Sequence, residues 1–169
     1  MTSSAERAGA SDLVDELGRR GLWLATAESL TGGLVAAAVV AVPGASNVFR
    51  GGIVAYATDV KAKLLGVDAA LLAERGPVDA EVAAQMARGV RERLGADVGI
   101  STTGAAGPDA QGMALPGTVF IGIDMSVQGV RTAYVRSLQL KGGRAAVRAA
   151  AVDEALGLAL ASLAPGGSH

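Results

Sequence analysis

The stretch Thr26-Ala27-Glu28-Ser29-Leu30-Thr31-Gly32-Gly33 separates two apolar segments, residues 22–25 before it and residues 34–42 after it. The first segment has the length of a short buried strand, and the second, rich in Ala and Val, predicts the start of a helix. A hydroxyl at such a strand-to-helix corner lies beside the unpaired N–H groups of the helix start, and glycines let a ligand approach the backbone closely. The stretch therefore indicates a nucleophile, Ser29, with an anion site beside it.

Outward from this corner, segments with strand-like and helix-like patterns alternate along the chain. Helices are predicted over residues 12–20, 31–41, 59–65, 68–74, 79–94 and 142–163. Strands are predicted over 22–27, 49–56, 97–103, 118–125 and 130–138, the last two forming a hairpin. The expected helix N-caps are Ser11, Thr58, Asp68 and Asp79. This alternation predicts an α/β fold, a single three-layer α/β/α domain with a mixed β-sheet.

The composition fits one folded domain and excludes several classes of site. The chain has 169 residues, 50% hydrophobic residues and a formal net charge of −1, so it has no basic surface of the kind that binds nucleic acid. It has no cysteine and a single histidine, His169, which excludes disulfides and thiolate metal sites and argues against zinc and a histidine triad. We expect a flexible N-terminal arm (1–10), the domain (11–164) and a flexible tail (165–169).

No secretory signal is visible, and the longest apolar run, residues 34–42, is shorter than the roughly 20 residues that a membrane-spanning helix needs. The expected location is therefore the cytoplasm, with no membrane partner and no direct nucleic-acid partner. No metal and no cofactor are expected.

Three expected loops follow strands, where open α/β sheets gather their ligands. The first contains Ser29, the second runs from Tyr56 to Lys61, and the third contains Thr102, Thr103 and Gly104. Without an available histidine, a lysine is the natural base for a serine nucleophile. Lys61 lies in the first turn of its predicted helix, where the helix dipole and partial burial both favour the neutral amine.

The same loops suggest supporting roles. The N–H groups of Thr31, Gly32 and Gly33 are expected to form an oxyanion hole. Tyr56 is expected to relay a proton or hold the substrate, and the third loop is expected to cradle a phosphate.

Each of these residues also has a structural interpretation. A serine before a helix is usually an N-cap, a lysine near a helix start is usually solvated, and a strand tyrosine usually packs at the surface of the core. Glu28 is typical of a buried or capping carboxylate, and residues 104–117 are equally typical of a mobile connection. Arg144 and Arg148 either reach a ligand or face solvent. Residue types alone support an α/β domain with a candidate serine site.

Several motifs in one order add to this reading. They are the corner already quoted, Gly51-Gly52-Ile53-Val54-Ala55-Tyr56 with Lys61, Lys63-Leu64-Leu65-Gly66-Val67, Gly104-Ala105-Ala106-Gly107-Pro108, Pro116-Gly117-Thr118-Val119 and Arg144-Ala145-Ala146-Val147-Arg148. With these motifs, over about residues 10–163, the sequence resembles the CinA carboxy-terminal domain family, also called nicotinamide-nucleotide amidase or NMN deamidase.

The resemblance implies hydrolysis of the carboxamide of nicotinamide mononucleotide to give nicotinic acid mononucleotide and ammonia, in pyridine nucleotide recycling. It implies a metal-independent serine amidase with Ser29 as nucleophile, Lys61 as base and Tyr56 as a supporting residue. The residues expected to form the oxyanion and substrate-binding site are Thr31, Gly32, Gly33, Glu28, Thr58, Thr103, Gly104, Ala105 and Gly107. A stand-alone domain that forms a homo-oligomer is also implied.

The chain departs from the family pattern around the rim of this site. Ala57-Thr58 stands in place of a Ser-Asn pair, Thr103 in place of a serine and Ala105 in place of an isoleucine, and Leu115-Pro116-Gly117 lacks a lysine. These changes leave two other hypotheses open. One is a catalytically silent nucleotide-binding protein linked to competence or the DNA damage response, and the other is an amidase for a different small amide or nucleotide.

Overall fold

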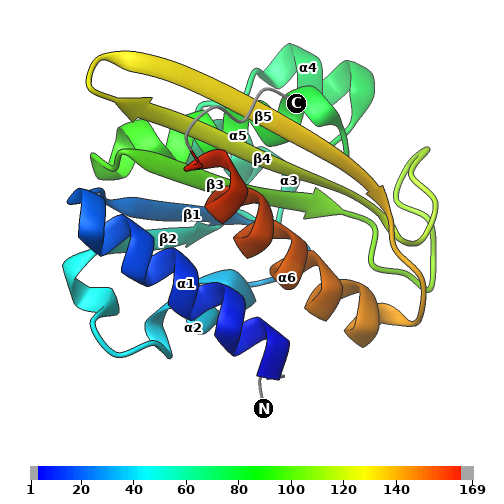
Figure 1. The fold of residues 1–169 in the computed structure, drawn as a ribbon. Helices are drawn as coiled ribbons and strands as arrows, with labels where there is room; N and C mark the ends of the chain where they lie inside the picture. Colours follow the sequence, from blue (N-terminus) through cyan, green and yellow to red (C-terminus); the bar gives the residue numbers. More distant parts are fainter. Residues whose placement is uncertain (1–3, 165–169) are drawn as a thin grey trace.

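The computed structural model describes residues 4–164, which form one five-stranded sheet with helices on both faces (Figure 1). The strands are β1 (Leu24–Glu28), β2 (Phe49–Val54), β3 (Val98–Gly104), β4 (Thr118–Val127) and β5 (Val130–Gln139). The helices are α1 (Ser4–Arg20), α2 (Leu34–Val40), α3 (Thr58–Leu65), α4 (Ala69–Arg75), α5 (Ala80–Leu94) and α6 (Arg144–Ser162), with a short 3₁₀ turn, η1 (Ala45–Asn47). The predicted α/β class is confirmed.

The strand order is β2-β1-β3-β4-β5, with β1 parallel to both β2 and β3. β4 runs antiparallel to β3, and the hairpin partner β5 runs antiparallel to β4, so the sheet is mixed, as predicted. The carboxyl ends of β1, β2 and β3 therefore meet at one edge of the sheet. Because β5 returns toward that same edge, α6 begins there as well.

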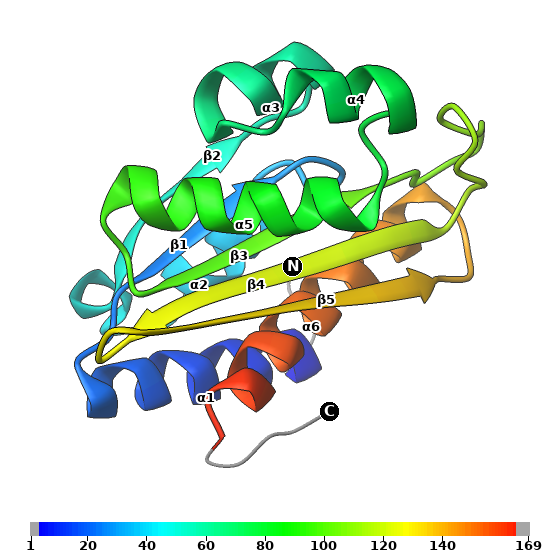
Figure 2. The same ribbon diagram turned by 90° about the horizontal axis from the view of Figure 1, so that it is seen from above.

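The two faces of the sheet are covered by different helices (Figure 2). One core joins α1, α2 and α6 to the sheet through buried residues such as Leu13, Val39 and Leu156. The other core lies under α3, α4 and α5 and includes Leu65, Leu72 and Met86. Together these cores complete the expected three-layer arrangement.

Several helix starts differ from the prediction: α2 begins at Leu34 rather than at residue 31, and α6 at Arg144 rather than at residue 142. The differences at α1 and α3 involve the expected caps. α1 begins at Ser4, so Ser11 is not its cap, and the described part of the expected arm, residues 4–10, is helical because Ala10 is buried against the core. The rest of the arm and the expected tail lie outside the described residues. α3 begins at Thr58 itself, because Ala57 has the extended conformation of the N-cap position and makes no side-chain cap.

Other terminus signals acted as predicted. The Asp68 carboxylate caps α4 by accepting from Ala70 N, and the Asp79 carboxylate caps α5 by accepting from Glu81 N and Val82 N. Within residues 4–164, no helix has both the length and the apolar character needed to cross a membrane.

Candidate active site

Ser29 is the first residue after β1, the strand paired on both sides by parallel neighbours. Its backbone N–H donates to Thr102 O at 2.9 Å, which ties the corner to the end of β3. Gly32 and Gly33 follow with positive φ angles of 60° and 100°, a conformation that glycine adopts without strain. The serine is 8% exposed, and the cap position of α2 belongs to Gly33, so Ser29 is not an N-cap.

Lys61 reaches Ser29 from the first turn of α3. Its Nζ atom lies 3.0 Å from Ser29 Oγ, 2.7 Å from Ala55 O and 3.4 Å from Tyr56 O. The residue is 1% exposed, so it is not the solvated lysine that a helix start usually carries. The two residues, 32 positions apart in the chain, meet because β1 and β2 are adjacent parallel strands that end at the same edge.

Burial lowers the pKa of Lys61 from its ordinary 10.5 to about 8. A buried ammonium loses hydration, which makes the neutral amine easier to form. The nearby carboxylate that would oppose this effect is engaged elsewhere, since Asp59 pairs with Lys63 at 2.7 Å on the exposed side of α3. An amine that titrates near neutral pH beside a serine hydroxyl is the arrangement of a general base and its nucleophile.

Glu28 supports the corner from inside and does not face the site. Its buried carboxylate accepts hydrogen bonds from Thr31 Oγ1 and from the backbone N–H groups at the start of α2, namely those of Gly33, Val35 and Ala36. The oxygens of Glu28 are thus occupied by the protein, and the structure does not bring this residue into the expected substrate-binding site. The capping interpretation is correct.

The expected oxyanion hole also needs revision. Gly33 N donates to Glu28 Oε2 at 3.0 Å, and Gly32 N donates to Ser29 O at 3.1 Å. Both amides are thus used within the corner and are not available to a substrate. The N–H groups of Leu30 and Thr31 donate no hydrogen bond within residues 4–164, so they are the free donors next to Ser29.

A small hollow of about 60 Å³ opens at Ser29. Its lining residues are Ser29, Leu30, Tyr56, Gly104, Ala106, Gln111 and Arg144. Tyr56 is 59% exposed, and its hydroxyl accepts a hydrogen bond from Arg144 Nη2 at 2.9 Å, so the tyrosine lies at the mouth of the hollow. The backbone carbonyl of Tyr56, rather than its hydroxyl, contacts Lys61.

The third loop contributes backbone more than side chains. Gly104 lines the hollow, and Gly107 O accepts a hydrogen bond from Arg144 Nη1 at 3.2 Å. Thr103 Oγ1 donates to Pro77 O at 2.7 Å, and the backbone of Ala105 pairs with Thr118 and Gly117. Thr103 and Ala105 thus support the loop from behind, and the structure does not bring them into the lining of the hollow where substrate contact was expected. The exposed Thr58 does not line the hollow either.

Two arginines of α6 reach the site from the far end of the chain. Arg144 lies at the mouth, and Arg148 donates to Leu30 O at 2.9 Å and to Thr31 O at 3.0 Å. The sequence alone did not decide whether these two side chains reach a ligand or face solvent. Their spacing of four residues on one helix places both on one face, but only the return of β5 shows that this face meets the corner.

No group of three or more His, Cys, Asp or Glu side chains within residues 4–164 is arranged to hold a metal ion. A larger hollow of about 820 Å³ lies elsewhere, along α5 and the end of α3, with Glu81, Arg88 and Glu92 among its lining residues. Arg88 and Glu92 pair with each other there, and the hollow has no nucleophile. The candidate nucleophile and base therefore lie at the small hollow.

The sequence and fold of the chain were compared with those of known proteins. A family model described as the CinA C-terminal domain matches residues 6–163. A CinA-like protein of Frankia casuarinae is 51% identical over 146 residues, covering 86% of this chain and 33% of the relative. A protein of Limosilactobacillus reuteri named putative competence-damage inducible protein is 44% identical over 146 residues, covering 86% of this chain and 35% of the relative. The chain thus spans about a third of the length of these relatives.

Solved structures agree over the whole fold. The competence/damage inducible protein CihA of Agrobacterium tumefaciens has a TM-score of 0.90 at 30% identity, covering 96% of this chain and 98% of the other. A CinA superfamily protein of Escherichia coli has a TM-score of 0.85 at 32% identity, covering 97% and 94%. The family model, the sequence relatives and the solved structures agree, so the chain belongs to the CinA C-terminal domain family.

Proposed function

We propose that this protein is a serine amidohydrolase that converts nicotinamide mononucleotide to nicotinic acid mononucleotide and ammonia. The observation that carries the proposal is the contact of 3.0 Å between the buried amine of Lys61 and the hydroxyl of Ser29. An amide is a poor electrophile, so its hydrolysis needs an activated nucleophile, donors for the oxyanion and a proton for the leaving amine.

The surroundings of Lys61 support its role as the base. A neutral amine has two hydrogens and one lone pair. The carbonyl oxygens of Ala55 and Tyr56, at 2.7 and 3.4 Å, are acceptors for the two hydrogens, which directs the lone pair to the Ser29 hydroxyl. With its pKa lowered to about 8, roughly a tenth of the amine is neutral at pH 7.

The proposed reaction proceeds in two halves. In the first, Ser29 Oγ bonds to the amide carbon while its proton passes to Lys61 Nζ, and the N–H groups of Leu30 and Thr31 receive the developing oxyanion. The Lys61 ammonium then returns the proton to the departing nitrogen as the C–N bond breaks, releasing ammonia and leaving an ester on Ser29. In the second half, a water loses a proton to Lys61 and attacks the ester, and the proton returns to Ser29 as the acid leaves.

The size of the hollow suggests how the substrate lies. A volume of about 60 Å³ accepts a carboxamide group but not a whole nucleotide, since pockets that enclose such ligands are several times larger. In the proposed pose, the amide enters the hollow and the rest of the nucleotide lies over its mouth. There Tyr56 offers a ring face, and the Arg144 guanidinium offers a partner for an anionic group.

The direct test measures ammonia and the deamidated product when the purified protein is incubated with nicotinamide mononucleotide, with and without a chelator. We expect release by the native protein in both conditions and none by Ser29→Ala or Lys61→Met, because each removes one member of the pair. Ser137→Ala and Lys63→Met are matched controls, since both residues are exposed and lie outside the hollow. Both controls are expected to retain native activity.

The possible outcomes separate the hypotheses. Full activity of a folded Ser29→Ala or Lys61→Met variant would overturn the role given to that residue. Tight binding of the nucleotide without turnover by the native protein would favour a binding protein, an outcome in keeping with the competence-damage names of the relatives. Release of ammonia only from other amides in a substrate panel would keep the mechanism and change the substrate.

A further inference from the structure

Arg148 links the last helix of the fold to the corner that carries Ser29. Its guanidinium donates from Nε to Leu30 O at 2.9 Å and from Nη2 to Thr31 O at 3.0 Å. These two carbonyls belong to the two residues that follow Ser29. The side chain is partly buried, so water competes only in part for these hydrogen bonds.

Holding these carbonyls also sets the direction of two N–H groups. A trans peptide unit is planar, so the carbonyl of one residue and the N–H of the next point in opposite directions. Arg148 therefore orients Thr31 N–H through Leu30 O, and Gly32 N–H through Thr31 O. Gly32 N–H donates to Ser29 O at 3.1 Å, and this bond turns the Ser29–Leu30 peptide so that Leu30 N–H points away from it.

Two N–H groups of this corner have no partner: that of Thr31, which Arg148 orients through Leu30 O, and that of Leu30, which the Gly32–Ser29 bond orients. Leu30 and Thr31 are 3% and 0% exposed, yet within the described residues neither N–H donates a hydrogen bond. Buried backbone N–H groups without an acceptor are rare in folded proteins. In α/β-hydrolases the N–H of the residue directly after the nucleophile binds a substrate oxygen, and Leu30 has that place beside Ser29.

The other charged support of the corner, Glu28, does not do this work. Its carboxylate accepts from Thr31 Oγ1 and from the N–H groups of Gly33, Val35 and Ala36, which lie further along the corner. None of these contacts fixes the peptide between Leu30 and Thr31. Among the described side chains, Arg148 is the one that donates to the carbonyl of Leu30.

We propose that Arg148 is a positioning residue that holds the Leu30 and Thr31 N–H groups toward the oxyanion of the reaction. The inference rests on the proposed amidase function. Arg148 contacts the backbone and not the substrate, so its loss is expected to lower kcat and to leave KM nearly unchanged. Misplaced oxyanion donors typically cost about 100-fold in rate.

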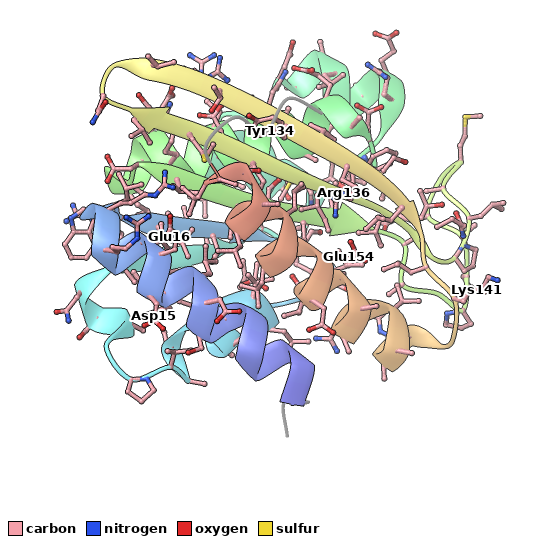
Figure 3. All side chains as sticks on the ribbon, viewed as in Figure 1. Asp15, Glu16, Tyr134, Arg136, Lys141 and Glu154 are labelled. Atoms are coloured by element: carbon pink, nitrogen blue, oxygen red, sulfur yellow. The ribbon has the colours of Figure 1, made fainter. Side chains whose placement is uncertain are left out.

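The experiment compares Arg148→Met and Arg148→Lys with the native protein and with Arg136→Ala. Arg136 of β5 pairs with Glu154 of α6 at 3.2 Å and does not line the hollow at Ser29; Figure 3 shows the two labelled side chains near each other. We expect kcat to fall about 100-fold in Arg148→Met and less in Arg148→Lys, whose single ammonium reaches one carbonyl. Arg136→Ala is expected to keep the native kcat and KM.

Two further measurements separate positioning from a loss of fold. Guanidinium chloride at millimolar concentration is expected to raise the kcat of Arg148→Met, while sodium chloride at the same ionic strength is not. The pH dependence set by Lys61 is expected to stay unchanged in both variants, because the Ser29–Lys61 contact does not involve Arg148. If Arg148→Met unfolds, the test is made with Arg148→Lys, whose kcat is calculated from the concentration of folded protein.

A native kcat in folded Arg148→Met would overturn the inference and leave the amidase intact. A rise in KM at constant kcat would also overturn it, by making Arg148 a substrate contact. Absence of ammonia release by the native protein would instead refute the proposed function, which the native arm of the experiment reports separately.

Discussion

Lys61 and Asp124 are both buried ionisable residues, but their surroundings are opposite. Lys61, on the carboxyl side of the parallel strands, contacts a hydroxyl and two carbonyl oxygens. Asp124, on β4, is 0% exposed and lies between Arg91 of α5 and Arg131 of β5, with 2.9 Å between its Oδ2 and Arg131 Nε. One group is buried among neutral atoms, and the other among opposite charges.

The difference distinguishes a residue suited to proton transfer, Lys61, from one that stabilises the fold, Asp124. A charge buried without a counter-ion is costly, so the Lys61 ammonium loses its proton more readily, as the proposed base requires. The Asp124 carboxylate has two arginines as counter-ions and ties α5 to the β4–β5 hairpin. The comparison makes four predictions.

The first prediction is that Lys61→Met lowers the rate of ammonia release by about 1000-fold or more, because the serine then has no base. A steady-state ammonia assay measures the loss, and circular dichroism checks that the fold is retained. Activity within tenfold of native would contradict the role of the amine, and Lys63→Met on the same helix is the matched control.

The second prediction is that Asp124→Ala lowers the free energy of unfolding by about 3 kcal/mol, because two arginines lose their shared counter-ion. Denaturant titration measures this change. At a temperature where the variant is folded, its kcat is expected to stay within twofold of native. The exposed Asp59→Ala is the control, with an expected change of less than about 0.5 kcal/mol since its ion pair with Lys63 is solvated. A marked loss of kcat in folded Asp124→Ala would contradict the assignment of Asp124 to stability alone.

The third prediction concerns the pH dependence of kcat/KM. The neutral form of Lys61 is the active one, so kcat/KM is expected to rise about tenfold per unit from pH 6 and to level off above about 8, where the amine has lost its proton. A pH–rate profile measures this, and Lys63→Met is expected to superimpose on the native curve. A flat profile between pH 6 and 8 would argue against a lysine base.

The fourth prediction is the smallest and concerns the pH dependence of stability. The folded pKa of Lys61, about 8, lies below the ordinary 10.5, so between these values the unfolded chain binds more protons than the folded one. Native protein is therefore expected to gain about 1 kcal/mol relative to Lys61→Met between pH 7 and pH 9. Parallel denaturant titrations of both proteins give the difference, and a shift of the opposite sign would mean that the fold stabilises the ammonium.

The sheet and the Ser29–Lys61 pair were predictable because both follow from local patterns and a simple rule. Alternating apolar segments predict the strands, and carboxyl ends of parallel strands meet at one edge. The resemblance to the CinA carboxy-terminal domain family named the same two residues. The contact between Ser29 and Lys61 does not depend on the Ser-Asn pair of the family pattern, since it forms here with Ala57-Thr58 in that place.

The rest depended on features that residue types do not encode. Which N–H groups of the corner are free depends on hydrogen bonds that the sequence does not show: Glu28 accepts from the N–H of Gly33, and Arg148 holds the Leu30–Thr31 peptide. The early start of α1 depends on packing against α6, a contact between the two ends of the described chain. Thr103 has the right chemistry for a ligand, but its hydroxyl is turned to Pro77 by the loop before α5.

The return of β5 to the edge where β1 ends has a consequence for synthesis. The nucleophile and its amine emerge from the ribosome within the first 61 residues, whereas Arg148 emerges near the end, on α6. A chain that stops before α6 therefore contains Ser29 and Lys61 but lacks the guanidinium that contacts the backbone after Ser29. In this fold, α6, the last helix to be translated, supplies the Arg148 contacts to the corner after β1, the first strand to be translated.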